Sequence, residues 1–181
     1  MIDLTPGLKK KYTPWIRKVG RYSVTDLYDI VHGNLTVKNF FKPSSFTQSS
    51  MYYMWKGKWD HMKAQDLLIE LGYEIEIKKE KKINDWVVVG RADCLQLDEV
   101  IEIKTSKNIL KPNPHHVFQT RIYCTLFEKK DGYIYQPMYK PLTHELYMRL
   151  VKKVQRDDAW AEEQFIKVDE FHNKLLTISN L

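Results

Sequence analysis

Alternation of apolar and polar residues predicts a group of strands in the middle of the chain. Tyr73 to Lys82 alternates apolar with charged positions, as a half-buried strand does, and Asn84-Asp85 then turns the chain into the next strand. That strand, Trp86 to Asp93, and the following one, Val100 to Thr105, are rich in Val and Ile. The polar break Gln96-Leu97-Asp98-Glu99 separates them. The pattern predicts a hairpin with its turn between Leu97 and Asp98.

Helical spacing and cap residues predict two helices ahead of these strands. Ser23 is placed as a helix cap with Asp26 in the first turn, and this helix stops near Gly33. From Thr47 to Leu71 a long amphipathic helix is expected, terminated by Gly72. Its apolar positions are Met51, Trp55, Trp59, Met62, Leu68 and Leu71.

The remaining third of the chain adds two helices and two strands. A helix is predicted from His115 to Lys130, with Gly132 ending it and with the buried stripe Phe118, Ile122 and Leu126. Tyr133 to Tyr139 is predicted as a strand. His144 to Lys153 is also assigned as a strand, although a helix would serve nearly as well. Asp157 or Asp158 caps a final helix from Ala159 to about Leu176. Together these elements predict an α/β fold, a small mixed central sheet with helices on both sides.

Two carboxylates face each other across the predicted hairpin. A turn between Leu97 and Asp98 places Asp93 opposite Glu102, with Cβ atoms about 5 Å apart. Such a pair repels unless a cation lies between the carboxylates, and hard divalent ions favour oxygen ligands. Lys104 shares the face of Glu102, because strand side chains alternate. Its ammonium could orient or deprotonate a water and offset charge on a phosphate, which suits metal-assisted phosphodiester hydrolysis.

The order of these residues matters, because the chain contains partial copies of the same patterns. Ile75-Glu76-Ile77-Lys78 repeats Ile101-Glu102-Ile103-Lys104 residue for residue, but no Asp is found ahead of Glu76 on a partner strand, and Glu76 is assigned to a solvated face. Gln48 and Tyr52 have the spacing of Gln119 and Tyr123, but they precede the carboxylates.

The ordered set resembles a known nuclease superfamily. His61, Gly90-x-x-Asp93, Glu102-x-Lys104 and Gln119-x-x-x-Tyr123 look like the PD-(D/E)xK nucleases, specifically their RecB-like branch. That branch includes CRISPR-associated RecB-like exonucleases and small nucleases of archaeal viruses. The match covers about residues 50 to 155. It implies a restriction-endonuclease-like fold and a Mg²⁺- or Mn²⁺-dependent DNase that leaves 5′-phosphate and 3′-hydroxyl ends.

The resemblance also implies roles for individual residues. The ion would be held by Asp93, Glu102, the backbone carbonyl of Ile103 and His61, whose nitrogen favours manganese. Taken alone, a single His is more often a structural or surface residue. Gln119 and Tyr123 would order the active site and contact the DNA backbone, and the alternative is that both are ordinary helix-surface residues.

The sequence departs from the RecB-like exonucleases in its cysteines. In those enzymes a comparable N-terminal segment leads into a cysteine of an iron–sulfur cluster, whereas His32 and Gly33 stand at that place here. Cys94 and Cys124 are the only cysteines, and they do not have metal-ligand spacing. We therefore expect no iron–sulfur cluster.

Size and hydropathy favour one compact domain in an intracellular, cytoplasmic protein. The chain has 181 residues, of which 43% are hydrophobic. We expect a nuclease core over residues 47–181, preceded by a basic arm and helical cap over residues 1–46. No apolar run approaches the roughly 20 residues of a membrane helix, and no apolar signal segment follows the basic N-terminus. No membrane partner is expected.

Positive charge points to nucleic acid as the partner. The net charge is +6, and in the first 22 residues six basic residues stand against Asp3 alone, with Tyr12, Trp15 and Tyr22 among them. A solvated arm is the alternative. Arg91 either touches phosphate or pairs with a carboxylate, and Gly90 either permits close approach of DNA or metal or forms a bulge. The candidate DNA-binding residues are Lys9, Lys10, Lys11, Arg17, Arg91, Lys107 and Lys111.

Several substrates remain open at this stage. The first choice is an exonuclease on single-stranded DNA or duplex ends, followed by a single-strand endonuclease and, more distantly, a Holliday-junction resolvase. A resolvase would require a symmetric dimer, so the question of a homo-oligomer stays open. From another class, the chain could be a non-catalytic nucleic-acid-binding module on a nuclease scaffold.

Overall fold

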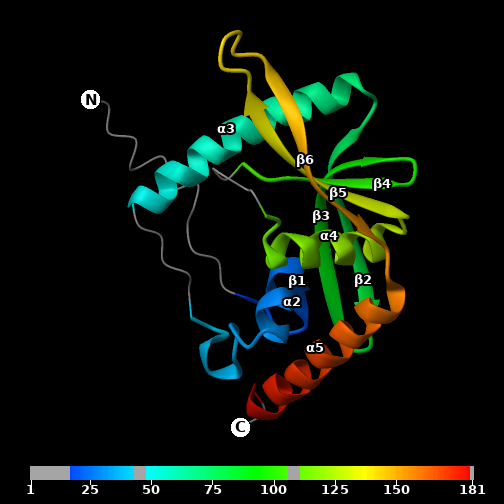
Figure 1. Cartoon of the computed structure of the whole chain (residues 1–181). Helices are drawn as coiled ribbons and strands as arrows, with labels where there is room; N and C mark the ends of the chain where they lie inside the picture. Colours follow the sequence, from blue (N-terminus) through cyan, green and yellow to red (C-terminus); the bar gives the residue numbers. More distant parts are fainter. Residues whose placement is uncertain (1–16, 43–47, 106–110, 180–181) are drawn as a thin grey trace.

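The fold is built around one mixed sheet (Figure 1). The computed structural model describes residues 17–42, 48–105 and 111–179. Within these residues the strands are β1 (Arg21–Ser23), β2 (Glu74–Ile83), β3 (Trp86–Gln96), β4 (Glu99–Ile103), β5 (Asp131–Tyr139) and β6 (Leu146–Gln155). The helices are α2 (Val24–Val31), the short 3-10 helix Val37–Asn39, α3 (Gln48–Glu70), α4 (Pro114–Phe127) and α5 (Asp158–Ser179).

Strand β3 is the centre of the sheet because it has three neighbours. β2 pairs with it antiparallel along one edge, from Ile83 opposite Trp86 to Glu74 opposite Leu95. The other edge is shared by β1, parallel to Val87–Val89, and by β4, antiparallel to Cys94–Gln96. β4 then pairs parallel with β5, and β5 antiparallel with β6. The mixed sheet that the sequence predicts is confirmed, including the strand assignment of β6.

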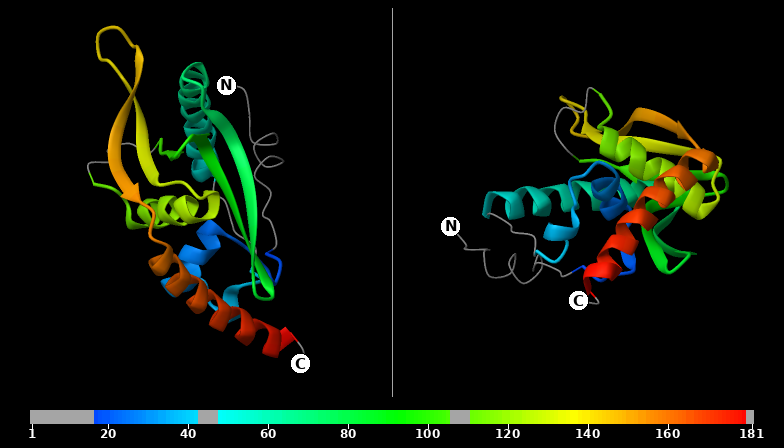
Figure 2. Two further views of the ribbon diagram at one scale, coloured as in Figure 1. Left: turned by 90° about the vertical axis from the view of Figure 1, so that its right-hand side faces the viewer. Right: turned by 90° about the horizontal axis from the view of Figure 1, so that it is seen from below.

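Helices pack on both faces of this sheet and bury two apolar clusters. The larger cluster joins β3 to α2, α4 and α5, and it contains Tyr22, Trp86, Phe118, Ile122 and Phe165. The smaller cluster joins α3 to β3 and β4, and it contains Ala64, Leu68, Cys94, Ile101 and Ile103. Figure 2 shows the tip of the β5–β6 hairpin and α5 at opposite ends of the molecule. In the described residues no helix is long and apolar enough to cross a membrane.

Local signals explain where the helices begin. Ser23 caps α2 in a complete capping box, in which its hydroxyl accepts from the backbone N–H of Asp26 and the Asp26 carboxylate accepts from the N–H of Ser23. Asn113 caps α4 ahead of Pro114 at the first helical position. The Asp157 carboxylate accepts from the N–H of Trp160 and caps α5, one of the two predicted alternatives.

Two glycines have roles other than those expected from the sequence. Helix α4 ends at Phe127 and is capped by Glu128, which adopts the left-handed conformation with φ 58°, whereas Gly132 lies in β5. Gly90 does not form a bulge, because it pairs regularly with Lys79, and helix α4 covers it. A Cβ atom on Gly90 would stand 3.0 Å from Cε1 of Tyr123. Its missing side chain therefore allows α4 to pack closely on β3.

Helix α3 has the predicted length and ends before Gly72, but its buried face differs from the apolar stripe in the sequence. Trp55, Trp59 and Met62 are exposed. Leu68 of the predicted stripe is buried, and the face that contacts the sheet runs through it together with Ala64 and Gln65. The pattern is correct for a helix, although it does not identify which side is covered by the sheet.

Candidate metal centre

Two successive hairpins align three carboxylates across neighbouring strands. The β3–β4 pairing places Gln96 opposite Glu99 and Cys94 opposite Ile101, as the predicted turn requires, and Asp93 and Glu102 are the next residues beyond its last pair. The β2–β3 pairing places Ile75 opposite Cys94 and Ile77 opposite Ala92, which brackets Glu76 and Asp93. Glu76, Asp93 and Glu102 therefore form one row, which we call the acidic row.

The sheet is irregular at the acidic row. Backbone pairing between β3 and β4 stops at Cys94 and Ile101, and beyond it the Asp93 carboxylate accepts a hydrogen bond from the backbone N–H of Ile103 at 2.7 Å. Glu76 adopts a left-handed backbone with φ 55° and leaves the β2–β3 ladder for one residue. A carboxylate thus replaces a main-chain partner where β3 and β4 separate.

Side-chain orientation also changes at this point. Ala92 and Ile77 pack in the larger cluster, whereas Cys94 and Ile75, two residues away on each strand, pack in the smaller cluster with α3. Residues two apart on a regular strand would share a face. The inversion lies at Glu76 and Asp93, so their side chains occupy the switch between the two faces.

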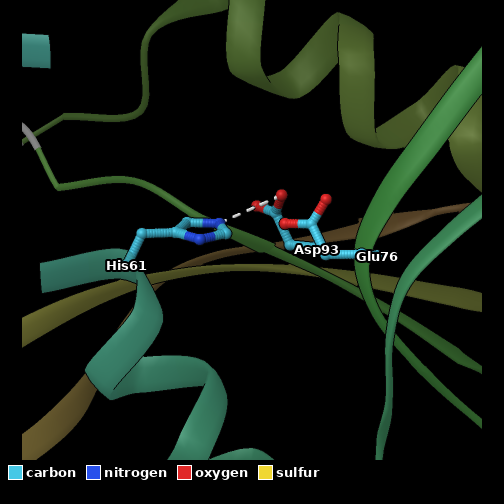
Figure 3. Close-up of side chains that lie close together, drawn as sticks. All are labelled: His61, Glu76 and Asp93. Atoms are coloured by element: carbon cyan, nitrogen blue, oxygen red, sulfur yellow. Dashed lines mark ion pairs between the residues drawn. The ribbon is translucent and has the colours of Figure 1, made fainter. Parts of the chain in front are cut away.

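Helix α3 supplies His61 to the acidic row. Its Nε2 lies 3.1 Å from Oδ1 of Asp93, as Figure 3 shows with Glu76 beside them. One turn later the buried Gln65 donates to Oε1 of Glu76 at 3.0 Å and to the backbone oxygen of Asp93 at 3.2 Å. Ligand atoms of His61, Glu76 and Asp93 all lie within 4.8 Å of one another, which is the arrangement expected of a metal site.

Glu102 connects the acidic row to Lys104 and α4. Lys104 Nζ donates to Glu102 Oε2 at 2.6 Å and to Gln119 Oε1 at 3.1 Å. Gln119 in turn donates to the hydroxyl of Tyr123 at 3.1 Å. Glu102 is buried, with 1% of its side chain exposed, whereas Lys104 is 18% exposed. The predicted residues Glu102, Lys104, Gln119 and Tyr123 thus form one hydrogen-bonded network.

The charges of the site influence one another strongly. Burial raises the pKa of Glu102, and the charge of Asp93 raises it further, while Lys104 lowers it. Burial lowers the pKa of Lys104, but the charges of Glu102 and Asp93 outweigh this effect, so the pKa is raised overall. The pKa of His61 is also raised overall. Burial lowers this pKa, but the hydrogen bond to Asp93 and the charges of the nearby carboxylates raise it more.

The donor set fits a divalent cation. Oε1 of Glu102 is buried and has no hydrogen-bond partner among the described residues. A buried carboxylate oxygen without a partner is costly, and a nearby cation would remove that cost. Glu76 and Asp93 offer oxygen ligands and His61 offers nitrogen within one group, and Glu102, which lies outside that group, offers a further oxygen, so Mg²⁺ or Mn²⁺ would suit these residues.

Glu76 lies on a solvated face of its strand, as the sequence predicts, but its position beside His61 and Asp93 was not predicted. Ligand atoms of Glu76, His61 and Asp93 lie within 4.8 Å of one another, and the Glu76 side chain is 39% exposed. The signal was present in the sequence, because the predicted Asn84-Asp85 turn places Glu76 opposite Asp93 just as the next turn places Glu102. Each turn fixes its register, and applying the argument to both hairpins identifies the whole acidic row.

The predicted DNA-binding residues have varied surroundings. Arg91 is exposed and its Nε lies 3.1 Å from Glu76 Oε2, so it pairs with a carboxylate in this structure. Arg17 pairs with the buried Asp26 carboxylate at 2.8 Å. Lys111 is exposed at the start of the segment before α4. DNA contact by any of them stays a prediction, and Lys9, Lys10, Lys11 and Lys107 lie outside the described residues.

Both cysteines belong to the packing of the sheet. Cys94 and Cys124 are free and buried, and burial raises the pKa of each thiol to about 12.

The sequence matches no protein-family model and no curated protein. The structure does match solved structures. An alkaline exonuclease from Laribacter hongkongensis, LHK-Exo, aligns with TM-score 0.59 and 16% identity over 88% of this chain and 89% of that chain. Its complex with dAMP gives TM-score 0.63.

Two further structures share the fold. A phage related exonuclease from Haemophilus somnus 129PT gives TM-score 0.61 at 14% identity, over 91% of this chain and 97% of that one. A protein named SSO0001 gives TM-score 0.57 at 22% identity, over 90% of this chain and 83% of that chain. At identities this low the likeness establishes the fold alone. The chain has the mixed sheet and flanking helices of these exonucleases, which confirms the predicted restriction-endonuclease-like fold.

Proposed function

We propose that this protein is a metal-dependent deoxyribonuclease that hydrolyses phosphodiester bonds to 5′-phosphate and 3′-hydroxyl ends. The observation that carries the proposal is the group of His61, Glu76 and Asp93, whose ligand atoms lie within 4.8 Å of one another, with Glu102 next in the acidic row and the Lys104 ammonium 2.6 Å from Glu102. A protein that only binds DNA does not need three aligned carboxylates, which repel phosphate when no cation is present.

The fold likeness supports the same function at a coarser level. The solved structures named above include exonucleases, and one of them is a complex with dAMP, which supports DNA as the substrate. Assignment to the RecB-like branch is the finer part of the proposal. It rests on the order of His61, Asp93, Glu102, Lys104, Gln119 and Tyr123 along the chain.

The residues of the site have distinct parts in the proposed reaction. Mg²⁺ or Mn²⁺, held by Asp93, Glu102, His61 and the Ile103 carbonyl with Glu76 in reach, would draw in the phosphate and acidify the attacking water. Lys104 holds that water and offsets the negative charge that develops on the phosphate. Gln119 fixes the Lys104 ammonium, and the Tyr123 hydroxyl fixes Gln119.

The bond changes then follow from in-line attack. The water oxygen bonds to phosphorus on the side opposite the 3′ oxygen, and its proton passes to solvent. The bond from phosphorus to the 3′ oxygen breaks, and that oxygen takes up a proton as a hydroxyl group. The phosphate stays on the 5′ end of the following nucleotide.

Single substitutions in the acidic row and at Lys104 test the chemistry. We expect Asp93→Ala, Glu102→Ala and Lys104→Ala each to lower Mg²⁺- or Mn²⁺-dependent cleavage at least about 100-fold, with unchanged circular dichroism. Lys78→Ala is the matched control, because Lys78 ends the second copy of Ile-Glu-Ile-Lys and is 55% exposed beside Glu80. Cleavage by all three site variants at the parent rate contradicts the proposal.

Substrate shape separates the remaining alternatives. We propose an exonuclease on single-stranded DNA or duplex ends, so linear DNA should be digested in Mg²⁺ or Mn²⁺ and circular single strands should survive. Cleavage of the circles indicates a single-strand endonuclease. A stable dimer that cuts four-way junctions in symmetric pairs indicates a resolvase. Binding without cleavage of any of these DNAs indicates a binding module.

A further inference from the structure

Exposed aromatic side chains gather on the first half of α3. Tyr52, Trp55 and Trp59 are 55%, 42% and 55% exposed. Their spacings of three and four residues place them on one helix face, which we call the aromatic ridge. Tyr53, 63% exposed, lies edge to face with Tyr52, with 5.6 Å between the ring centroids. Single exposed apolar residues are ordinary, whereas a contiguous group marks a contact surface.

Lysines accompany the aromatic ridge. Lys56 and Lys63 are exposed and follow Tyr52 and Trp59 by one helical turn, and Lys63 Nζ lies 5.4 Å from the Trp59 ring centroid. Lys58 is exposed on the same stretch. Asp60, the acidic residue between positions 52 and 63, accepts a hydrogen bond from the hydroxyl of Tyr139 at 3.1 Å.

This combination matches a single nucleic-acid strand better than a protein. Aromatic rings stack on bases whatever the sequence, and interleaved ammonium groups contact the phosphates between them. A symmetric contact between two copies of the chain would gather the lysines of both copies in one interface, where like charges repel. Charge complementarity therefore favours an anionic partner with flat apolar groups.

The aromatic ridge and the candidate metal centre are served by the same stretch of α3, on different faces of the helix, because His61 is about 200° around the helix axis from Trp59. Helix α3 crosses the end of β4 at Gly57, where a Cβ atom would stand 2.7 Å from Oγ1 of Thr105, the residue after Lys104. His61 follows one turn later and contacts Asp93. Residues 52–56 continue past this crossing, and Figure 1 shows that end of α3 extending beyond the sheet. A DNA strand that leaves the metal centre and passes around α3 meets Lys58, which lies between His61 and Trp55 around the helix axis, and then the ridge.

We propose that the aromatic ridge stacks the bases of single-stranded DNA while its scissile phosphate lies at His61 and Asp93. Lys56, Lys58 and Lys63 contact the flanking phosphates. This role rests on the proposed nuclease function and narrows its substrate to a single strand, because the bases of an intact duplex are not free to stack on a side chain.

Binding without cleavage tests the ridge. Fluorescence anisotropy in EDTA measures the affinity for labelled oligothymidylate of about twelve nucleotides and for a duplex of the same length. We expect Trp55→Ala/Trp59→Ala to weaken single-strand binding about tenfold or more and to leave duplex binding within about twofold. Trp55→Phe/Trp59→Phe should stay within about threefold of the parent, because the rings remain. Lys56→Gln/Lys63→Gln should flatten the salt dependence by about 0.7 in slope for each phosphate that is no longer neutralised by a lysine.

The control is a double variant at exposed apolar residues elsewhere. Leu142→Ala/Ile166→Ala removes side chains that are 95% and 61% exposed, and it should bind like the parent. Single-strand binding by the Trp55→Ala/Trp59→Ala variant at parent affinity, with intact circular dichroism, overturns the proposal. A parent that is dimeric by size, with this variant monomeric, also overturns it, because the ridge then covers a second copy.

Failure of the ridge and failure of the nuclease have different signatures. If the protein cuts DNA in Mn²⁺ but its binding of oligothymidylate does not depend on Trp55 and Trp59, the nuclease proposal stands and the ridge proposal is wrong. If binding depends on both tryptophans but the protein cuts no DNA, the ridge is a strand-binding surface and the nuclease proposal is wrong.

Discussion

Glu76 combines a strained backbone with a place in the acidic row. A left-handed conformation costs a non-glycine residue about 1–2 kcal/mol, and the nearby Asp93 adds charge repulsion. Hydrogen bonding by Gln65 and the contact with Arg91 offset part of this cost. Strain of this kind is typically retained where a residue serves a function. We propose metal ligation as that function, because the ligand atoms of Glu76, His61 and Asp93 lie together.

The Glu76→Gln variant tests that explanation at the level of one residue. We expect it to melt no lower than the parent in EDTA, because it relieves repulsion with Asp93. Mn²⁺ at a hundred times Kd should stabilise the parent by about 2.7 kcal/mol, a rise of several degrees in Tm. Calorimetry should show that Mn²⁺ binding by Glu76→Gln is about tenfold weaker or more.

Glu74→Gln is the control for this experiment, since Glu74 is an exposed residue of the same strand. It should reproduce the Mn²⁺ response of the parent. An undiminished response in the Glu76→Gln variant would remove Glu76 from the ligand set and leave its backbone conformation without a functional reason.

At the scale of elements, turn positions account for most of what the sequence predicts correctly. The breaks at Asn84-Asp85 and Leu97-Asp98 set both hairpin registers, and a register decides which side chains meet. Asp93 and Glu102 can therefore be paired from their distances to the turn. The left-handed conformation of Glu76 cannot be predicted in this way, because it depends on Gln65 and on charges from two other strands, which no local pattern contains.

Helix α3 shows the limit of periodicity. Spacing of apolar residues identifies a helix, but burial depends on which side meets the rest of the fold. The tryptophans form the larger apolar stripe, yet the sheet is contacted by Ala64 and Leu68. Small residues let α3 approach closely enough for His61 to reach Asp93.

Close packing of α4 on β3 depends on Gly90. A substitution at Gly90 should therefore show how much this packing contributes to stability. Gly90→Ala places a methyl group against Leu126 and the Tyr123 ring, so α4 must shift. We expect a loss of about 1–3 kcal/mol in the free energy of unfolding, measured by urea denaturation. Cleavage should fall as well, because Tyr123 and Gln119 move with the helix.

A double-mutant cycle supplies the control. Leu126→Ala alone leaves a cavity, but in combination with Gly90→Ala the added methyl group occupies part of that space. The double variant should therefore be more stable than the sum of the single effects predicts. Strict additivity would show that Gly90 and Leu126 do not meet.

At the scale of the whole molecule, the candidate metal centre lies between the two apolar clusters, and its α4 side carries two histidines. His115 and His116 occupy the first turn of α4, and His115 packs against Tyr28 of α2, with 4.6 Å between ring centroids. Burial lowers the pKa of His116 to about 4, and the charges of Lys104 and His115 contribute. A histidine kept neutral in the folded state makes stability depend on pH.

The direction of the pH dependence of stability follows from the difference between the pKa of His116 in the unfolded and in the folded protein. Unfolded His116 binds a proton near pH 6.5, whereas the folded protein does so only near pH 4, so unfolding takes up protons between these values. Stability should be greatest above pH 6.5 and fall as the pH decreases toward 4. In urea denaturation at pH 7.5 and pH 5, we expect His116→Gln to lose less stability than the parent, by roughly 1 kcal/mol, since the ring is partly solvated.

His144→Asn is the matched histidine variant, because His144 is an exposed turn residue with φ 55°, a conformation that Asn tolerates. It should keep the acid sensitivity of the parent. Equal loss of stability in the parent and His116→Gln would mean that His116 is already protonated in the folded protein.

The two tight turns that align the acidic row limit how the chain can change length. An extra residue inserted at Asn84-Asp85 would slide Glu76 past Asp93, and one at Leu97-Asp98 would displace Glu102 in the same way. Insertions are tolerated in most surface loops, but here they would separate ligands that lie far from the insertion point. Among descendants of this sequence that keep the ligand set, the spacings from 76 to 93 and from 93 to 102 should be invariant, while the β5–β6 connection is free to lengthen.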